Sequence, residues 1–317
     1  MDVSTKDPVK LSVVVVAWNS WPDLERCLRA IDASSFRDLE VIVIDNASAD
    51  DTAKRLPLEF PRVRLEANSA NLGHTRGVNQ GIALARGRLV LVIDADAFVD
   101  RTAIERLVAF LDARPDAALV APRLYSEDGS IQESAKRLPT VINGLFGRYS
   151  TLTRLFPNNR FSSRYLERGQ VSATEPFQTE HLSSACVMFR RNLVDKIGPW
   201  DEGYRGYWVD ADWCMAALRS GAKAYCIPRA TAIHRESYSR TKKKTPNRVW
   251  MFHMGAYRFY RKWHTRGTLD PRAIFAWLAL AARAALIIAG NAFRRSAPQP
   301  IPAPEFAGKP GGKSTAV

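Results

Sequence analysis

Cysteine is scarce in this sequence, and its spacing fits neither a disulfide framework nor a zinc site. The 317 residues include four cysteines, none in a C-x-x-C pair: Cys27, Cys186, Cys214 and Cys226. Most lie among apolar neighbours, which is typical of reduced thiols in a protein core. We therefore expect a cytosolic protein without structural disulfides. The apolar run at 11–17 is too short and wrongly flanked for a signal peptide or a membrane span.

Acidic residues are almost missing from one region. Residues 1–228 carry 29 basic and 29 acidic side chains, whereas residues 229–295 carry 15 basic and only 2 acidic ones. Almost all of the net charge of +14 therefore lies in the second region. Such an asymmetry favours an anionic partner, either membrane lipid or nucleic acid. The alternative is a solvated basic face without a partner.

Strand and helix patterns alternate through the first half of the chain. Apolar runs at 11–17, 39–44 and 89–94 and a weaker one at 63–66 predict buried strands, and helical spacing follows each of them. This alternation predicts an α/β fold with a mostly parallel central sheet flanked by helices. Ligands of such sheets bind beyond the carboxyl ends of the strands. Polar residues follow four predicted strands there: Asn19, Asp45, Asn71, Asp94 and Asp96.

The second half of the chain is predicted to extend this sheet. We expect a hairpin around Asp128-Gly129, a helix at 208–220 and a last strand at 223–227 that ends at Pro228. Residues 139–180 show no clear period and are predicted to form a mobile insertion. Residues 296–317 are rich in proline, glycine and alanine, and we expect them to be disordered.

Two aspartates one residue apart follow the apolar strand at 89–94. Asp94 and Asp96 can present carboxylate oxygens to a hard cation, and Mg²⁺ or Mn²⁺ bound with a diphosphate suits so few protein ligands. The alternative is a pair of turn or capping residues ahead of the next helix. The other polar strand ends on the same edge favour a binding site.

Five motifs in order resemble family 2 glycosyltransferases of the GT-A fold. They are VVVVAWNS, VIVIDNASADDT, NLGHTRGVNQGIALARG, LVIDADA and a segment from PWDEGYRGYWVDADW to ATAIH, and together they cover about residues 10–235. Two further stretches, PRLYSEDGSIQESAKRLPT and SSACVMFRRNLVDKIGPWDEGY, resemble the bacterial branch that uses dTDP-L-rhamnose. The resemblance implies a catalytic domain at 1–235, with a donor half near 10–100 and an acceptor half near 115–235.

The resemblance implies a role for each matching residue. Asp45 would accept a hydrogen bond from the pyrimidine N3–H, although an Asx turn with Ser48 is the alternative. Asp96 and His234 would bind the cation, and Asp94 would contact the ribose or the metal. Further donor contacts are implied for Ala17, Asn19, Asn71, Gly73 and Asn79, and Arg76 would reach a phosphate.

The catalytic base is expected on the helix at 208–220. Asp210 and Asp212 lie roughly 200° apart around that helix, so only one can face the site. The family has a Glu-Asp pair where this chain has Val209-Asp210, which favours Asp210 as the base. The resemblance also implies an acceptor site, formed by Asp201, Glu202 and Trp208, although a solvated loop is the alternative for the first two.

The basic region mixes aromatic and cationic side chains along a predicted helix. Such a mixture suits a membrane interface and also single-stranded nucleic acid. The next apolar segment, 273–290, contains Arg283 and is marginal for a span, so we expect it to lie in the membrane surface or to pack on the catalytic domain. No nucleic-acid motif matches the region, and we therefore assign residues 236–295 to membrane association.

Together these features predict an inverting, metal-dependent glycosyltransferase. It would move a sugar, L-rhamnose, from dTDP-rhamnose to a saccharide acceptor, which is expected to be lipid-linked, at the inner face of the cell membrane in cell-envelope polysaccharide synthesis. A UDP-hexose donor is an alternative, because uracil and thymine present the same N–H to Asp45. A basic membrane- or nucleic-acid-binding protein on an inactive domain is an alternative from another class.

Overall fold

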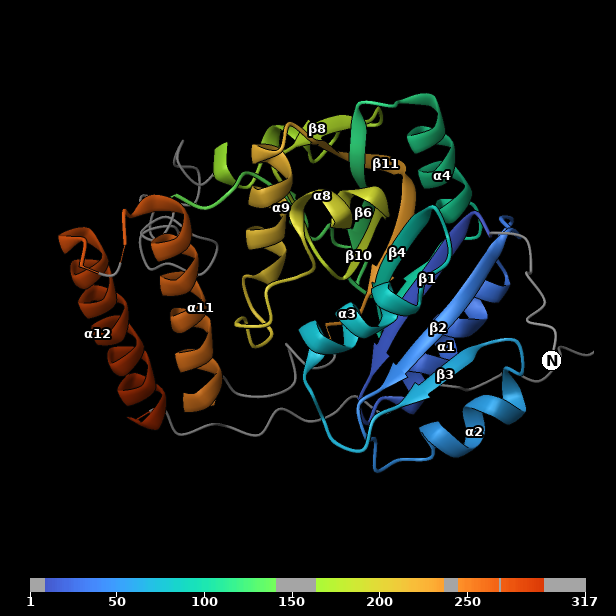
Figure 1. Ribbon diagram of the computed structural model, residues 1–317, viewed down its shortest axis with the longest axis horizontal. Helices are drawn as coiled ribbons and strands as arrows, with labels where there is room; N and C mark the ends of the chain where they lie inside the picture. The colour runs from blue at the N-terminus through green and yellow to red at the C-terminus, as the bar shows by residue number, and fades with distance from the viewer. Residues whose placement is uncertain (1–8, 141–163, 237–244, 268, 294–317) are drawn as a thin grey trace, which may run out of the picture.

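The structure is a computed structural model that describes residues 9–140, 164–236, 245–267 and 269–293. Most of the expected insertion and all of the expected disordered tail therefore lie outside the described residues. Figure 1 shows a sheet with helices on both faces and two long helices to one side.

The central sheet holds nine strands within the described residues, in the order β3-β2-β1-β4-β10-β6-β11-β5, and β8 pairs with β11. β1, β2, β3 and β4 are parallel to one another, β6 is parallel to β11, and β10 runs antiparallel between β4 and β6. The strands are β1 (Leu11–Ala17), β2 (Leu39–Asp45), β3 (Arg64–Ala67), β4 (Leu89–Asp94), β5 (Ala97–Val99), β6 (Ala117–Tyr125), β8 (Phe177–Thr179), β10 (Cys186–Arg190) and β11 (Lys223–His234). A small second sheet pairs β7 (Ala135–Lys136) with β9 (His181–Leu182).

The helices form two layers. α1 and α4 pack their apolar stripes on one face of the sheet, and α3, α8 and α9 cover the other. Successive strand residues alternate between the two cores, as period 2 requires. The helices are α1 (Trp21–Asp32), α2 (Thr52–Glu59), α3 (His74–Leu84), α4 (Ala103–Ala113), α8 (Asn192–Ile197), α9 (Val209–Arg219), α11 (Pro246–His264) and α12 (Pro271–Phe293), with a 3-10 turn at Arg168–Gln170. The predicted α/β fold is confirmed.

α3 lies unusually close to β1 because it presents glycines to the strand. A Cβ on Gly81 would lie 2.2 Å from Cγ1 of Val14, and one on Gly77 would lie 2.8 Å from Cγ1 of Val16. Any larger residue would therefore push α3 away from the sheet. This packing fixes the helix whose first turn borders the site described below.

The strands differ from the prediction at three places: one predicted end was wrong, and two short strands were missed. β11 does not end at Pro228: the register shifts between Ile227 and Thr231, and pairing then resumes to His234. Pro228 lies within this irregularity. Because proline has no N–H to donate, it is tolerated where the strand pairing is interrupted. A short strand, β5, follows the two aspartates directly and pairs antiparallel with the end of β11. The last residues of the expected insertion form β8, which pairs with β11.

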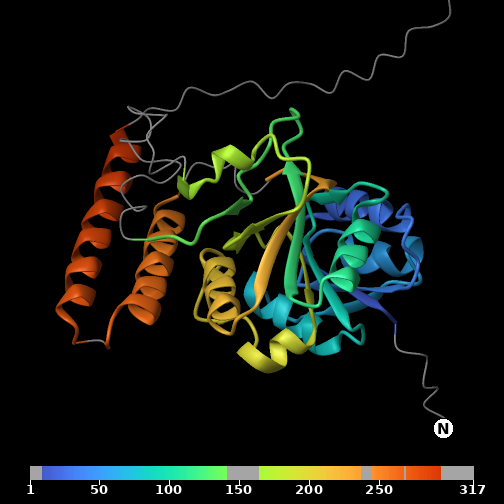
Figure 2. The same ribbon diagram turned by 90° about the horizontal axis from the view of Figure 1, so that it is seen from above.

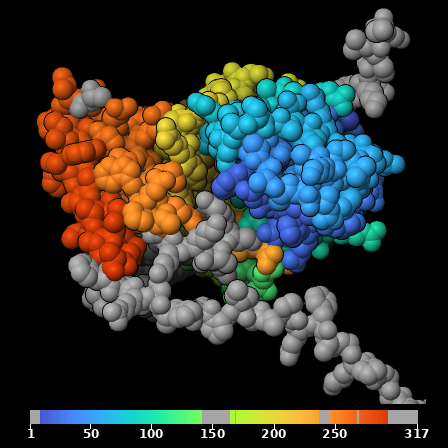
Figure 3. Space-filling view, turned by 90° about the horizontal axis from the view of Figure 1, so that it is seen from below, coloured from blue at the N-terminus to red at the C-terminus, as the bar shows by residue number. Residues whose placement is uncertain are grey.

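α11 and α12 stand beside the sheet domain. α11 lies against α9, and α12 contacts α11 and forms the outer flank of the molecule (Figures 1 and 2). The space-filling view in Figure 3 shows α12 at one edge and the first strands and helices at the opposite edge. By length and composition, α12 is long and apolar enough to cross a membrane over Pro271–Ala292, and only 11% of an apolar 18-residue window within it is buried.

Candidate functional site

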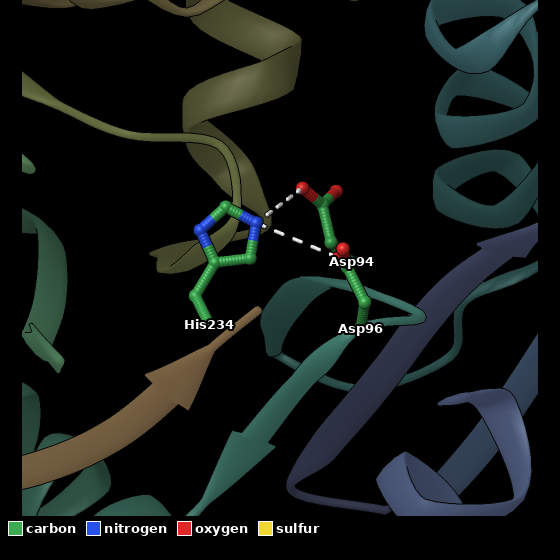
Figure 4. Close-up of side chains that lie close together, drawn as sticks. All are labelled: Asp94, Asp96 and His234. Atoms are coloured by element: carbon green, nitrogen blue, oxygen red, sulfur yellow. Dashed lines mark ion pairs between the residues drawn. The ribbon is translucent and has the colours of Figure 1, made fainter. Parts of the chain in front are cut away.

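The ends of β4 and β11 and the turn between β4 and β5 bring three possible metal ligands together. One ligand atom from each of Asp94, Asp96 and His234 lies within 4.8 Å of the others. Nε2 of His234 is 3.7 Å from Oδ2 of Asp94 and 3.5 Å from Oδ1 of Asp96, and Figure 4 shows the imidazole facing both carboxylates. The structure thus places the three residues expected at a metal site next to one another.

Strand pairing explains why residues so distant in sequence meet. His234 pairs with Ala97 in the β5–β11 ladder, and the N–H of Arg235 donates to the carbonyl of Asp96 over 3.0 Å. The chain therefore turns back immediately after β4 and carries Asp96 to the end of β11. The alternative had two parts: Asp96 does lie in a turn, between β4 and β5, whereas capping of the next helix is wrong, because the two aspartates lead into β5.

Gln132 fixes the orientation of the His234 ring. Its Oε1 lies 3.0 Å from Nδ1 of His234, and its Nε2 donates to the His234 carbonyl over 2.7 Å and to Oγ of Ser126 over 3.2 Å. Since an amide oxygen only accepts, Nδ1 carries the proton and Nε2 faces the carboxylates. A ligating histidine is typically held this way, by a hydrogen bond from its other ring nitrogen. Gln132 was missed in the sequence, which gives no local signal for it.

His74 is a second imidazole beside the cluster and was also missed. It is the first residue of α3, and its Nε2 lies 3.2 Å from Oδ1 of Asp94. Burial lowers the pKa of His74, but the hydrogen bond and the charge of Asp94 outweigh burial and raise the pKa above its ordinary value. Its position in the motif after Gly73 was the available signal.

The carboxylates of Asp94 and Asp96 favour positively charged groups beside them. Burial raises the pKa of Asp94, but the contact with His74 and the charge of His234 outweigh it and hold the pKa below the ordinary value. Burial lowers the pKa of His234, but the hydrogen bond to Asp96 and the charges of Asp94 and Asp96 raise it. Two acids and an imidazole with a fixed tautomer fit a divalent cation of the Mn²⁺ or Mg²⁺ type.

Asp210 and Asp212 point to opposite sides of α9, as the helix geometry predicts. Asp210 is a quarter exposed and faces Nε2 of His181 at 3.2 Å. Its charge acts on the pKa values of His74 and Asp94, so it lies on the same side as the cluster. Asp212 is 2% exposed and turns to α11. It accepts hydrogen bonds from Tyr204 Oη, Lys262 Nζ and Trp263 Nε1 over 3.0, 2.7 and 2.7 Å.

The residues expected to bind the base line the ends of β1 and β2. Asp45 is 2% exposed, and its carboxylate accepts from the N–H and Oγ of Ser48, so the expected local contact with Ser48 is present. Asn19, at a φ of 49°, joins the two strand ends: its Oδ1 accepts from the N–H of Ala49 over 2.6 Å. Ala17 is fully buried in β1. Recognition of a base by these residues stays a prediction.

Of the residues expected to contact the donor, Asn79 and Arg76 are joined to the loop after α8. Asn71 accepts from the N–H of Gly73 over 2.8 Å, and Gly73 caps α3 at a φ of 86°, which favours glycine. Asn79 binds both backbone groups of Trp200, over 2.9 and 3.0 Å. Arg76 pairs with Glu202 over 3.0 Å. These contacts hold the two halves of the domain together. Donor contacts of Asn79 and Arg76 stay predictions.

Two of the expected acceptor residues, Asp201 and Trp208, fasten α11 to the domain. Asp201 pairs with Arg258 over 2.7 Å and with Lys262 over 3.4 Å. The ring of Trp208 packs on Phe252 and Phe259 of α11, with centroids 5.6 Å apart in both cases. Nothing in the local sequence marks these partners, because they lie about 50 residues further along the chain. Acceptor binding by either residue stays a prediction.

The family model for Glycosyl transferase family 2 matches residues 12–198. An N-acetylglucosaminyl-diphospho-decaprenol L-rhamnosyltransferase of Mycobacterium tuberculosis is 28% identical over 285 residues, which is 83% of this chain and 91% of that protein. The succinoglycan biosynthesis protein ExoO of Rhizobium meliloti is 36% identical over 179 residues, about half of either chain, or 52% and 51%.

Solved structures share the fold. S. aureus TarS superposes with a TM-score of 0.53 at 14% identity, and GalNAc-T7 with UDP, GalNAc and Mn²⁺ superposes with 0.55 at 17%. The matches cover 88% and 81% of this chain, which spans about half of those two chains, 49% and 50%. These likenesses establish the GT-A architecture. With the matched family model, they show that the chain is a glycosyltransferase of family 2.

Proposed function

We propose that this enzyme transfers L-rhamnose from dTDP-rhamnose, with inversion, to a lipid-linked saccharide in cell-envelope polysaccharide synthesis. The observation that carries the metal-dependent part is the convergence of Asp94, Asp96 and His234 beside Asp210 at one edge of the sheet. The identity to the Mycobacterium tuberculosis L-rhamnosyltransferase over 83% of this chain supports the sugar and the acceptor class.

Asp96 and His234 would hold Mn²⁺ or Mg²⁺, with Asp94 as a further ligand or a ribose contact. When bound, the cation offsets the negative charge that develops on the departing nucleoside diphosphate. Gln132 keeps Nε2 of His234 turned toward the carboxylates. The base and ribose would lie along the ends of β1 and β2, beside Ala17, Asn19 and Asp45, and donor contacts would extend to Asn71, Gly73, Arg76 and Asn79.

Asp210 is the proposed catalytic base. The acceptor hydroxyl oxygen forms a bond to C1 of the sugar while the bond from C1 to the diphosphate oxygen breaks, and that electron pair leaves with the nucleoside diphosphate. The hydroxyl proton passes to the Asp210 carboxylate. Each carboxylate oxygen has two lone pairs, so the contacts with His181 and with the N–H of Ala211 leave room for this proton. Attack from the face opposite the leaving group inverts C1.

A UDP-hexose is the second candidate donor. The structurally similar GalNAc-T7 was solved with UDP, GalNAc and Mn²⁺, and a carboxylate at Asp45 would accept equally from uracil and thymine. The experiment is direct: the full chain is incubated with Mn²⁺, N-acetylglucosaminyl-diphospho-decaprenol, and either dTDP-L-rhamnose or UDP-glucose, and nucleoside diphosphate release is measured. Release that depends on the acceptor is expected with dTDP-L-rhamnose. Comparable turnover of UDP-glucose with none of dTDP-L-rhamnose would contradict the proposed donor.

The enzyme would work at the inner face of the cell membrane, through α12 and the basic residues near it. The exposed side of α12 is apolar, and its exposed large side chains are Ile274, Phe275, Trp277, Leu278 and Leu286. Such a surface suits hydrocarbon rather than water or nucleic acid. Nearby arginines and lysines would add attraction to anionic lipids. Membrane contact would also bring the enzyme to a lipid-linked acceptor.

A further inference from the structure

A buried histidine lies directly behind the proposed base. His181 belongs to β9 and pairs with Lys136 of β7, and 2% of its surface is exposed. Nothing in the local sequence marks it, because it reaches α9 only through the pairing of two short strands. Its ring is packed beneath the first turn of α9, and Asp210 in that turn is partly exposed.

The contacts of the ring define its tautomer. Nε2 of His181 is 3.2 Å from Oδ2 of Asp210, whereas Nδ1 is buried and has no hydrogen-bond partner in the described part of the chain. A proton on Nδ1 would bury an unsatisfied donor, and a proton on Nε2 donates to the carboxylate. The favoured tautomer is therefore the one in which His181 donates to Asp210.

We propose that His181 is a positioning residue for the base: its Nε2–H fixes one oxygen of Asp210, so that the carboxylate is held toward the acceptor hydroxyl. This inference rests on the proposed function, because it takes Asp210 as the base. The backbone N–H of Ala211 holds the other oxygen over 2.9 Å. The two donors together prevent rotation of the carboxylate, which matters because small displacements of a reacting group cost much of its rate.

The charges around the pair support this role. Burial lowers the pKa of His181 despite the nearby Asp210, which favours the neutral ring. Burial raises the pKa of Asp210, but the contact with His181, through charge and hydrogen bond, and the charge of Lys136 outweigh it and hold the pKa well below the ordinary value. The other titratable groups whose charges couple to Asp210 are His74, Asp94 and Cys214. Asp210 thus stays ionised and oriented.

The test compares His181→Leu, which removes the donor, with His181→Gln, whose amide N–H can reach the position of Nε2. Transfer to N-acetylglucosaminyl-diphospho-decaprenol is measured with Mn²⁺ and the donor that turns over, between pH 5 and 8. We expect kcat of His181→Leu to fall by about 10- to 100-fold with KM for the donor unchanged. Without the donated N–H the pKa of Asp210 rises, so the loss should grow as the pH falls toward 5. His181→Gln should recover most of the rate.

His181→Asn supplies a second variant should the leucine variant fail to fold. Its shorter amide cannot reach Asp210, so it should behave like His181→Leu while keeping a polar group in the site. A purely structural histidine would give a loss that does not change with pH and is not rescued by glutamine, and that result would overturn the inference.

Asp210→Asn separates the proposed role of Asp210 as the base from the proposed positioning role of His181. If Asp210→Asn keeps the wild-type rate, the proposed base is wrong and the positioning role falls with it. If Asp210→Asn is inactive while the His181 variants keep the wild-type rate and pH profile, only the positioning role is contradicted.

Discussion

The site edge of the sheet and the pair α11 and α12 use the same kinds of residue in opposite ways. At the edge, the carboxylates of Asp94, Asp96 and Asp210 converge with imidazoles on one region of the surface. In the contact with α11, Asp201 pairs with Arg258, and Asp212 pairs with Lys262 and accepts a hydrogen bond from Trp263. Asp210 and Asp212 belong to one helical turn, but Asp210 faces the site edge and Asp212 faces α11. The partners of an acid, rather than its neighbours in sequence, decide its role.

Asp96→Ala should have the largest effect, because the cation would lose an anchoring oxygen beside the diphosphate. We expect loss of transfer and of Mn²⁺-dependent nucleotide binding, measured by product formation and by calorimetry. Asp116→Ala is the matched control, since Asp116 lies at the opposite edge of the sheet and pairs with Arg114 and Lys223. Wild-type activity and Mn²⁺ dependence in Asp96→Ala would show that the metal assignment is wrong.

Asp210→Asn should separate chemistry from binding. The amide keeps the shape of the side chain but takes no proton at neutral pH, so kcat should fall by about 100- to 10,000-fold while donor affinity survives. Asp212→Asn should retain most of kcat but lower the free energy of unfolding by about 1.5–3 kcal/mol, because its three donors face a carboxylate. The reverse ranking in kcat would mean that the roles of the two sides of α9 are exchanged.

Membrane binding should depend on the exposed apolar side chains of α12. Phe275 and Leu286 are 72% and 74% exposed, so the double variant Phe275→Asn with Leu286→Asn should reduce flotation with anionic liposomes by on the order of 100-fold. Leu58→Asn is the control, since Leu58 is 82% exposed on α2, away from α12.

High salt should weaken liposome binding by the wild type only partly, because apolar burial is not screened. Equal flotation of the double variant would place the membrane contact elsewhere. A gel shift with single-stranded nucleic acid that survives physiological salt would instead favour the nucleic-acid alternative.

The smallest effect is expected from lowering the pH, which acts on the ion pair between Asp201 and Arg258 of α11. Partial burial raises the pKa of Asp201, but hydrogen bonds from Arg258 and from the N–H of Gly203 outweigh it and lower the pKa. The pair therefore stabilises the fold above the unfolded pKa of about 3.9 and loses that contribution as the pH falls through the lower folded value. Asp201→Asn should reduce stability by about 0.2–1 kcal/mol at pH 7.

The check is thermal unfolding of both forms over a pH series. The difference in Tm between wild type and Asp201→Asn should be constant from pH 7 to about pH 5 and shrink below about pH 4. A difference that grows on acidification would contradict the ion pair.

The sheet was predictable because its signals are local. Leu11–Ala17 is apolar except for Ser12, and Leu89–Asp94 is apolar up to Ile93, since both faces of each strand are buried. Polar residues follow where each strand leaves the core. The carboxyl ends of parallel strands share one edge, so the grouping of Asp94 and Asp96 with the ends of β1 and β2 could be foreseen.

The remaining contacts depend on pairings between distant segments. His181 reaches Asp210 through β7 and β9, strands of two residues each, and Gln132 reaches His234 from a loop. Neither segment is long enough to show a period. Likewise, Asp201 resembles an acceptor-binding acid in sequence. Only the packing of α11 shows that Asp201 also forms an ion pair with Arg258.

We propose above that Asp96 and His234 hold a cation against the leaving diphosphate. The most direct measurement is a crystal structure of the full chain grown with Mn²⁺ and dTDP, with anomalous scattering recorded for manganese. We expect one anomalous peak bonded to a carboxylate oxygen of Asp96, to Nε2 of His234 and to oxygens of both phosphates. Manganese bound elsewhere, or dTDP bound at the sheet edge without contact between the metal and these two side chains, would contradict it.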